Sequence, residues 1–174
     1  MSNYKTKLSS VKAFAFDVDG VFTDGTVLCT ETGDLLRMHN AKDGYALRVA
    51  ILKGYPVAII TGGSSESIIK RFEPIGVNDI FLKSHYKIPD FESFCKKYDL
   101  KPEEVLYMGD DIPDYHVMQL VGLPTCPQDA CPEIKAISKY ISHKNGGQGA
   151  VRDVIEQVMK VQGKWMESFD GKHD

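Results

Sequence analysis

Five polar side chains spread along the chain could together carry out phosphate chemistry: Asp17, Asp19, Thr61, Lys87 and Asp110. Several carboxylates brought into one place repel each other unless a cation joins them. A hard divalent ion suits such a cluster, and Mg²⁺ typically binds one or two carboxylates together with water and phosphate. A lysine and a threonine beside that ion would complete a phosphate site. Mg²⁺ is therefore the expected cofactor.

The three aspartates can divide the chemistry among them. Asp17 has the role of nucleophile, because its carboxylate can attack phosphorus in line and form an aspartyl-phosphate. Asp19, two residues further on, first protonates the leaving alkoxide and then takes a proton from the hydrolytic water. Asp110 joins Asp17 in holding the metal. Taken alone, an Asp-x-Asp-Gly segment is weak support, since a strand that ends in a solvated acidic turn has the same pattern.

Other polar groups are expected to hold the phosphate. The Thr61 hydroxyl and nearby backbone N–H groups, such as that of Gly62, bind its oxygens, and Lys87 neutralises them. Asp111 or Asp114 could complete the metal shell or orient Lys87.

Each of these residues also has a simpler interpretation. Thr61 could cap the helix that follows it. Lys87 could be a solvated surface lysine, and Lys83 competes for its role. Asp111 and Asp114 could be acids at a helix N-terminus, where the helix dipole favours them.

The elements that must position these residues alternate between strands and helices. Buried strands are expected at residues 11–16, 56–60, 80–82 and 105–108, with shorter ones at 123–125 and 140–141. Helical patterns separate them, the clearest with apolar residues at 151, 154, 155, 158 and 159. This order predicts an α/β fold, a doubly wound, Rossmann-like parallel sheet with helices on both faces. Because ligands bind at the carboxyl ends of strands in such sheets, the polar residues should meet at one edge.

A protruding β-hairpin is predicted at about residues 25–40. Two apolar segments flank a turn-like cluster at 31–34, where Gly33 supplies a positive φ. The ribbon is rather apolar for an exposed one, and a lone two-stranded hairpin is marginal in water. Packing against copies of itself would bury these side chains. The alternative is that the hairpin folds back on its own core.

Size and composition favour a globular enzyme domain. The 174 residues are most simply one domain, 1–174, with a polar tail at 164–174. Apolar residues make up 43% and the net charge is −3, which argues against a nucleic-acid binder. The polar N-terminus lacks a signal-peptide pattern, and no apolar run has membrane-spanning length. We therefore expect a cytoplasmic protein with no membrane or nucleic-acid partner.

The polar signals together resemble the haloacid dehalogenase superfamily of phosphotransferases. Its four motifs match, in order, Asp17-Val18-Asp19-Gly20, Thr61, Lys87 and Gly109-Asp110-Asp111-x-x-Asp114. The resemblance spans nearly the whole chain, and four motifs at four strand ends are far more specific than any one of them. It implies a phosphoenzyme on Asp17 and Mg²⁺ held by Asp17, Asp110 and the backbone carbonyl of Asp19.

Members of this superfamily often carry a cap domain that closes over the substrate, and this chain has no room for one. The hairpin and one helix fill most of the segment from Asp17 to Thr61, and a helix and a strand fill the segment from Thr61 to Lys87. Either the substrate is macromolecular and covers the site itself, or another subunit acts as the lid.

The capless pattern is similar to the 3-deoxy-D-manno-octulosonate 8-phosphate phosphatase family, which makes a sugar acid for lipopolysaccharide. The matching segments are residues 17–25, 42–45, 60–62, Arg71, 109–111 and 146–152. The family implies a homotetramer in which hairpins assemble centrally and a neighbour helps to close each site. It implies hydrolysis of the terminal phosphate of an eight-carbon keto acid. Close relatives act on a nine-carbon homologue in sialic-acid-type pathways.

Two departures from the family pattern concern the substrate. Gly63 and Gln148 stand where the family often has arginines that would suit a carboxylate- and phosphate-bearing substrate. Three other basic residues could supply the charge as substrate-binding residues: Lys42, Arg71 and Arg152. In the simpler interpretation, Arg71 is a solvated helix residue and Arg152 pairs with an acid such as Glu156.

Two competing functions use the same fold. One is a non-catalytic module that holds an oligomer together, which the hairpin suggests and the intact polar set argues against. The other keeps the chemistry but acts on a phosphorylated protein or a nucleic-acid end, as an open site would permit. The acidic net charge disfavours the nucleic acid.

Overall fold

A six-stranded parallel sheet lies at the centre of the computed structural model, which describes residues 4–166. The spatial order of the strands is β5-β4-β1-β6-β7-β8. Their bounds are β1 Ala13–Phe16, β4 Val57–Ile60, β5 Asp79–Phe81, β6 Val105–Met108, β7 Leu123–Cys126 and β8 Tyr140–Ile141. Every residue of β1, β4 and β6 is buried, as expected for parallel strands covered on both faces.

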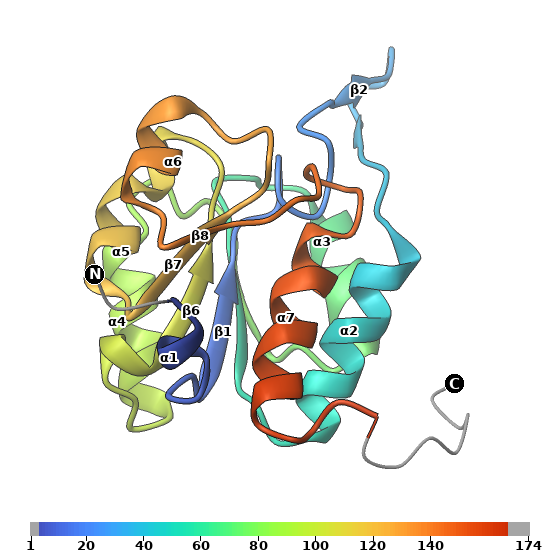
Figure 1. Ribbon diagram of the computed structural model, residues 1–174. Coiled ribbons are helices and arrows are strands. Elements are labelled where there is room, and N and C mark those ends of the chain that lie inside the picture. The colour runs from blue at the N-terminus through green and yellow to red at the C-terminus, as the bar shows by residue number, and fades with distance from the viewer. Residues whose placement is uncertain (1–3, 167–174) are drawn as a thin grey trace.

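Helices cover both faces of this sheet. The apolar side chains of four helices pack on one face: α1 Tyr4–Leu8, α2 Ala41–Leu52, α3 Glu66–Phe72 and α7 Ala150–Val161. Those of three others pack on the opposite face: α4 Ile88–Lys97, α5 Tyr115–Leu120 and α6 Pro132–Ile137. Figure 1 shows α2 and α7 on one side of the sheet and α4, α5 and α6 on the other. The predicted doubly wound parallel sheet is confirmed.

The strand order reverses between β1 and β6. From β1 the chain passes outward to β4 and β5, then crosses back to β6 and continues to β7 and β8. Ligands in open parallel sheets bind in the crevice at such a switch point, beyond the carboxyl ends of the strands. Asp17 directly follows β1, and Asp110 follows β6 after a single glycine. The topology therefore directs these two carboxylates to the same crevice.

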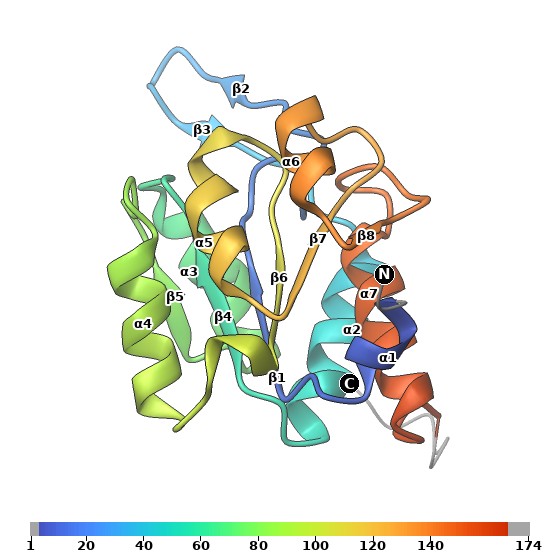
Figure 2. The same cartoon turned by 60° about the vertical axis from the view of Figure 1, so that its left-hand side comes forward.

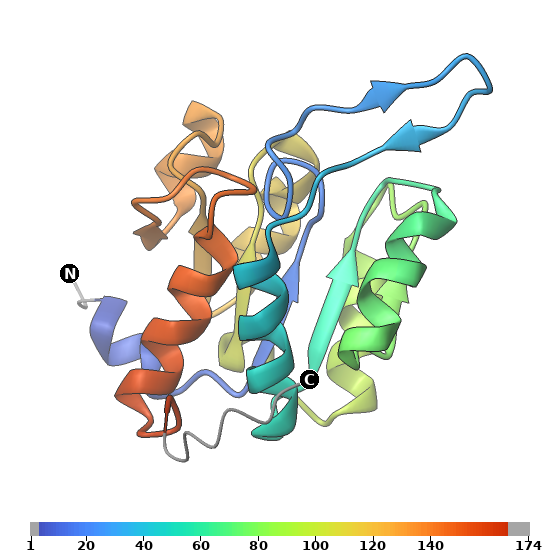
Figure 3. The same cartoon turned by 90° about the vertical axis from the view of Figure 1, so that its right-hand side faces the viewer.

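The hairpin forms a separate two-stranded antiparallel sheet of β2 (Leu28–Cys29) and β3 (Leu35–Leu36). It projects from the end of the molecule at which the long strands end (Figure 2, Figure 3). Five of its apolar side chains are exposed: Val27, Leu28, Leu35, Leu36 and Met38. The hairpin thus protrudes as predicted and does not fold back on its own core. Within residues 4–166, the segment between Asp17 and Thr61 contains only the hairpin, α2 and β4, so no cap domain covers the crevice.

Two local features differ from the expectation. α1 was not predicted, because its five residues are too few and too polar for a periodic pattern. It is held by buried Leu8 and by the Tyr4 ring, whose centroid lies 4.8 Å from that of Tyr140. The predicted polar tail includes a packed residue near its start, since the ring of Trp165 packs against that of Tyr45. The rest of that tail, from residue 167, lies outside the described residues.

Among the described residues, we find no helix with the length and apolar character needed to cross a membrane.

Candidate active site

Three carboxylates meet at the switch point. One oxygen from each of Asp17, Asp110 and Asp114 lies within 4.8 Å of the others. The counter-charge comes from Lys87, the residue that precedes α4. Its Nζ lies 2.8 Å from Asp17 Oδ2 and 2.7 Å from Asp114 Oδ1, and only 2% of the lysine side chain is exposed. The structure thus places Lys87 beside the expected nucleophile, while Lys83 is exposed.

Asp114 is committed to contacts within the protein. Its Oδ1 also accepts a hydrogen bond from the Tyr107 hydroxyl at 2.7 Å, and its Oδ2 accepts one from the backbone N–H of Asp110 at 3.1 Å. Gly109 permits this arrangement, because a Cβ at that position would overlap the Asp114 carboxylate. Of the two roles considered for Asp114, this geometry fits the orientation of Lys87 better than the binding of a metal.

The carboxylates of the cluster hold more negative charge than one lysine can balance. Burial, and then the charge of Asp114, raise the pKa of Asp17 to about 7, although Lys87 opposes this. Burial, followed by the charges of Asp17 and Asp114, raises the pKa of Asp110 to about 8. Burial also lowers the pKa of Lys87, but the nearby carboxylates outweigh it, so that this pKa is raised. Lys87 is therefore a permanent cation.

The loop after β1 brings backbone close to Asp110. Gly20 has φ +78°, and a Cβ there would overlap the Asp110 carboxylate. The Thr23 hydroxyl oxygen fixes the loop by accepting from the N–H groups of Gly20 at 3.3 Å and Gly25 at 3.2 Å. Within residues 4–166, no hydrogen-bond donor contacts the Asp110 carboxylate. Its oxygens are thus available to a ligand.

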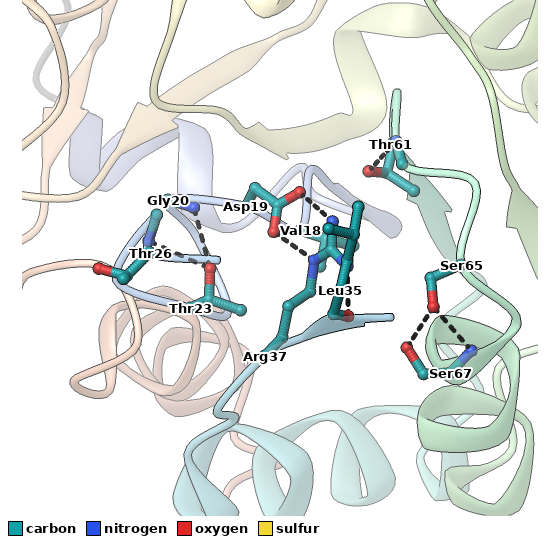
Figure 4. A network of polar contacts seen from close by, with 12 residues as sticks. Val18, Asp19, Gly20, Thr23, Thr26, Leu35, Arg37, Thr61, Ser65 and Ser67 are labelled. Atoms are coloured by element: carbon teal, nitrogen blue, oxygen red, sulfur yellow. Dashed lines mark hydrogen bonds and ion pairs between the residues drawn. The ribbon is translucent and has the colours of Figure 1, made fainter. Parts of the chain in front are cut away.

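Asp19 is held by an arginine of the hairpin. The Arg37 Nε lies 2.7 Å from Asp19 Oδ1, and its Nη2 lies 3.0 Å from Oδ2 (Figure 4). The arginine side chain is 5% exposed and that of Asp19 is 34% exposed. The hairpin therefore contacts the active site directly within one chain.

Thr61 follows β4 and is almost completely buried. Its hydroxyl oxygen accepts from the Gly63 N–H at 3.1 Å, which leaves the O–H able to donate to a ligand. Thr61 does not cap α3. That role belongs to Ser65, whose side chain accepts from the Ser67 N–H (Figure 4).

One cavity of about 360 Å³ unites most of the residues predicted from the sequence. Its lining includes Asp17, Asp19, Thr61, Gly62, Lys87 and Asp110. Asp111 also lines this cavity, and its side chain makes no capping hydrogen bond to the turn that follows it.

The three basic residues predicted to bind substrate lie elsewhere. Lys42 and Arg152 line a separate cavity of about 430 Å³ near the start of α7. Arg152 forms an ion pair with Glu156 at 3.1 Å, as in its simpler interpretation. The Arg71 guanidinium occupies the space that a side chain at Gly44 would fill. Within one chain these residues do not join the carboxylate cluster, so their role as substrate ligands stays a prediction.

Two functional contacts were not predicted from the sequence. Tyr107 lies in an apolar strand, and nothing in that pattern indicates that its hydroxyl reaches Asp114. Arg37 offered a weak signal, because it is the one Lys or Arg residue in the predicted hairpin. Its partner Asp19 is 18 positions away in the sequence, too far for a local pattern to show.

Comparison with known proteins decides the family. Residues 76–155 match the haloacid dehalogenase-like hydrolases. The 3-deoxy-D-manno-octulosonate 8-phosphate phosphatase of Salmonella typhi is 35% identical over 163 residues, which cover 94% of this chain and 87% of the relative. This chain belongs to that phosphatase family. The family enzyme of Yersinia pestis is 32% identical, with 91% of this chain and 84% of the relative covered.

Solved structures of the phosphatase family share this fold. The Moraxella catarrhalis phosphatase, in complex with a magnesium ion, a phosphate ion and a KDO molecule, gives a TM-score of 0.91 at 32% identity and 95% coverage of both chains. The cobalt-bound phosphatase of Haemophilus influenzae gives 0.89 at 25% identity, with 96% of this chain and 98% of that one covered. The family resemblance predicted from the motifs is confirmed.

The residues at the site fit the divalent cation predicted for it. The Asp110 carboxylate has no donor among the described residues, and burial, followed by repulsion within the cluster, raises the pKa values of Asp17 and Asp110. A divalent cation would relieve that repulsion. Asp17 and Asp110 are the carboxylates of the cluster that line the cavity, whereas Asp114 does not. Mg²⁺, present in the Moraxella catarrhalis structure, is a hard ion suited to these oxygens.

The raised pKa values predict how the metal-free protein responds to pH. Asp17 and Asp110 have folded pKa values of about 7 and about 8, above the ordinary 3.8. Between about pH 4 and about pH 8, the folded state keeps protons that the unfolded chain has lost. The free energy of unfolding of the metal-free protein therefore falls as pH rises through this range. Because Mg²⁺ must displace these protons, its effect should grow with pH. We expect it to raise Tm by about 5 °C or more near pH 8 and by much less near pH 5.

Thermal unfolding with and without Mg²⁺ at both pH values checks this. Asp110→Asn should lose most of the Mg²⁺ effect near pH 8, whereas Asp34→Asn, at an exposed position of the hairpin, should keep it. An equal Mg²⁺ effect at both pH values would contradict the assignment of Asp17 and Asp110 as the metal-binding carboxylates.

Proposed function

We propose that this chain is a Mg²⁺-dependent phosphatase that removes the terminal phosphate of 3-deoxy-D-manno-octulosonate 8-phosphate, a phosphorylated sugar acid used to make lipopolysaccharide. The observation that carries the proposal is the ion-paired cluster of Asp17, Lys87 and Asp114 at the switch point. The proposal is supported by the similarity to a phosphatase named for this substrate, 87% of whose length is covered by this chain.

Asp17 is the proposed nucleophile. The Val18 N–H holds its Oδ1 at 2.6 Å and Lys87 holds its Oδ2 at 2.8 Å, so the carboxylate is fixed at the cavity wall. Attack forms a bond between a carboxylate oxygen and phosphorus and breaks the bond from phosphorus to the sugar oxygen. Asp19 gives that leaving oxygen its proton. The products of this first half-reaction are an aspartyl-phosphate on Asp17 and a free sugar acid.

The second half restores the enzyme. Asp19, now a carboxylate, takes a proton from water as the water oxygen attacks phosphorus and releases the Asp17 carboxylate with inorganic phosphate. The Thr61 hydroxyl, the Gly62 N–H and Lys87 hold the phosphate oxygens in both halves. Mg²⁺, bound by Asp17, Asp110 and the backbone carbonyl of Asp19, would supply positive charge that offsets the negative charge of the phosphate.

Assembly through the hairpin is part of the proposal. The exposed apolar side chains of the hairpin are unusual on a ribbon of two-residue strands, and burial against copies of itself would remove them from water. We propose a homotetramer in which a neighbouring subunit closes the open cavity. Lys42, Arg71 and Arg152 are proposed as substrate ligands only across such an interface. A cytoplasmic location stays a prediction of the sequence.

Replacement of the nucleophile tests the reaction. Asp17→Asn keeps the shape of the side chain but removes its charge, so kcat should fall by about 10³-fold or more. Phosphate release with Mg²⁺ is measured for the eight-carbon keto acid phosphate, its nine-carbon homologue and a plain aryl phosphate. Asp24→Asn, at an exposed position, is the control and should stay near wild type.

The substrate panel separates the alternatives. Unchanged activity in Asp17→Asn would rule out the mechanism, and no activity in either form would favour a non-catalytic assembly module. A preference for the nine-carbon acid would change the substrate, and turnover of the aryl phosphate alone would remove the sugar acid from the proposal.

Replacement of exposed hairpin leucines tests the assembly. Leu28 and Leu36 are 64% and 50% exposed, so glutamates there should leave the fold intact and prevent hairpin packing. We expect Leu28→Glu/Leu36→Glu to sediment as smaller species than wild type and to lose about 10-fold or more of its kcat/KM for the keto acid phosphate. Leu52→Glu on α2 is the matched control, since Leu52 is 52% exposed. A wild type that sediments as a monomer would contradict the tetramer and favour a macromolecular substrate.

A further inference from the structure

Arg37 lies between two cavities. One is the active-site cavity, whose lining includes its partner Asp19 and also Gly63. The other, of about 540 Å³, lies along the hairpin and is lined by Arg37 together with Leu28, Leu36 and other residues. The guanidinium engages both oxygens of the Asp19 carboxylate (Figure 4). While this two-point contact lasts, the carboxyl group is turned toward the hairpin and is not available to a leaving group.

The described lining of the active-site cavity has no unpaired Lys or Arg side chain for a second anionic group. Its described lining contains the carboxylates of Asp17, Asp19, Asp110 and Asp111 but only one Lys or Arg side chain, that of Lys87. Lys87 is already paired with two carboxylates. A substrate with both a phosphate and a carboxylate therefore needs another positive charge near the cavity.

Arg37 is placed to supply that charge. Its Nη2 lies 3.6 Å from the point at which a Cβ on Gly63 would stand. Because residue 63 is a glycine, no side chain separates the guanidinium from this part of the cavity wall. Its contact with Asp19 is open to exchange, because 34% of the Asp19 side chain is exposed. A guanidinium that leaves one carboxylate for another keeps a planar, two-point partner, which makes the exchange inexpensive.

We propose that Arg37 is a specificity-determining residue that leaves Asp19 for the carboxylate of the substrate, and so makes Asp19 available when a carboxylate-bearing substrate is in place. Substrates that lack this group leave Arg37 on Asp19 and turn over poorly. The inference rests on the proposed function, since it requires a phosphorylated sugar acid. It adds a reason for the enzyme to reject phosphates of sugars that have no carboxylate but fit the same cavity.

Kinetics on two substrates test the inference. The preference is the kcat/KM for the eight-carbon keto acid phosphate divided by that for a hexose 6-phosphate, which has no carboxylate. A hydrogen bond to a charged group is worth about 1.5–3 kcal/mol, so Arg37→Met should lower the preference by about 10- to 100-fold. Arg37→Lys keeps the positive charge but cannot make the two parallel hydrogen bonds of a guanidinium, so it should give an intermediate preference. Arg48→Met, which removes a guanidinium bonded to the Ile75 carbonyl away from both cavities, should keep the wild-type preference.

Binding gives a second readout that needs no turnover. If Asp19 competes with the substrate carboxylate for Arg37, Asp19→Asn should bind the free keto sugar acid more tightly than wild type in calorimetry. That gain should vanish in Arg37→Met/Asp19→Asn. An arginine that only fastens the hairpin would give no gain in Asp19→Asn.

The outcomes decide between the two levels of the account. A preference within about 3-fold of wild type in Arg37→Met, or no gain in affinity in Asp19→Asn, would overturn the role of Arg37 alone. A wild type that hydrolyses the hexose phosphate but neither binds nor hydrolyses the keto acid phosphate would overturn the proposed function, and the role of Arg37 with it.

Discussion

The ammonium group of Lys87 lies between the carboxylates of Asp17 and Asp114 at the point where the strand order reverses. This contact holds a buried, like-charged cluster together, but burial and the charge of Asp114 still raise the pKa of Asp17. The surrounding backbone is adapted to it, because Gly20 and Gly109 have no side chains that would displace the neighbouring carboxylates. A site with this imbalance favours a divalent cation and then a phosphate.

The hairpin connects that cluster to the surface. Its strands do not join the large sheet, and their leucines are exposed. Arg37, which directly follows β3, nevertheless forms an ion pair with Asp19. One element thus carries both an unpaired apolar surface and a direct contact with the proposed acid–base residue. Movement or packing of the hairpin would therefore alter the acid–base residue as well as the access to the cavity.

The parallel sheet explains why much of this could be predicted from the sequence. Strand ends converge in such a sheet, so residues that follow buried apolar runs, such as Asp17, Thr61 and Asp110, had to meet. Side chains placed by long-range contacts could not be predicted in this way. Arg37 reaches Asp19 only because the hairpin doubles back, and Arg152 stays with Glu156 on its own helix. Periodicity shows which face of an element is buried, but not where a long polar side chain ends.

The central claim is that Asp17 becomes phosphorylated during turnover. The most direct measurement is mass spectrometry of the enzyme after acid quench during steady turnover of the keto acid phosphate with Mg²⁺. The account predicts a phosphate adduct on the peptide that contains Asp17, and none in Asp17→Asn. Full turnover with no adduct at Asp17, or an adduct on another residue that persists in Asp17→Asn, would contradict the account.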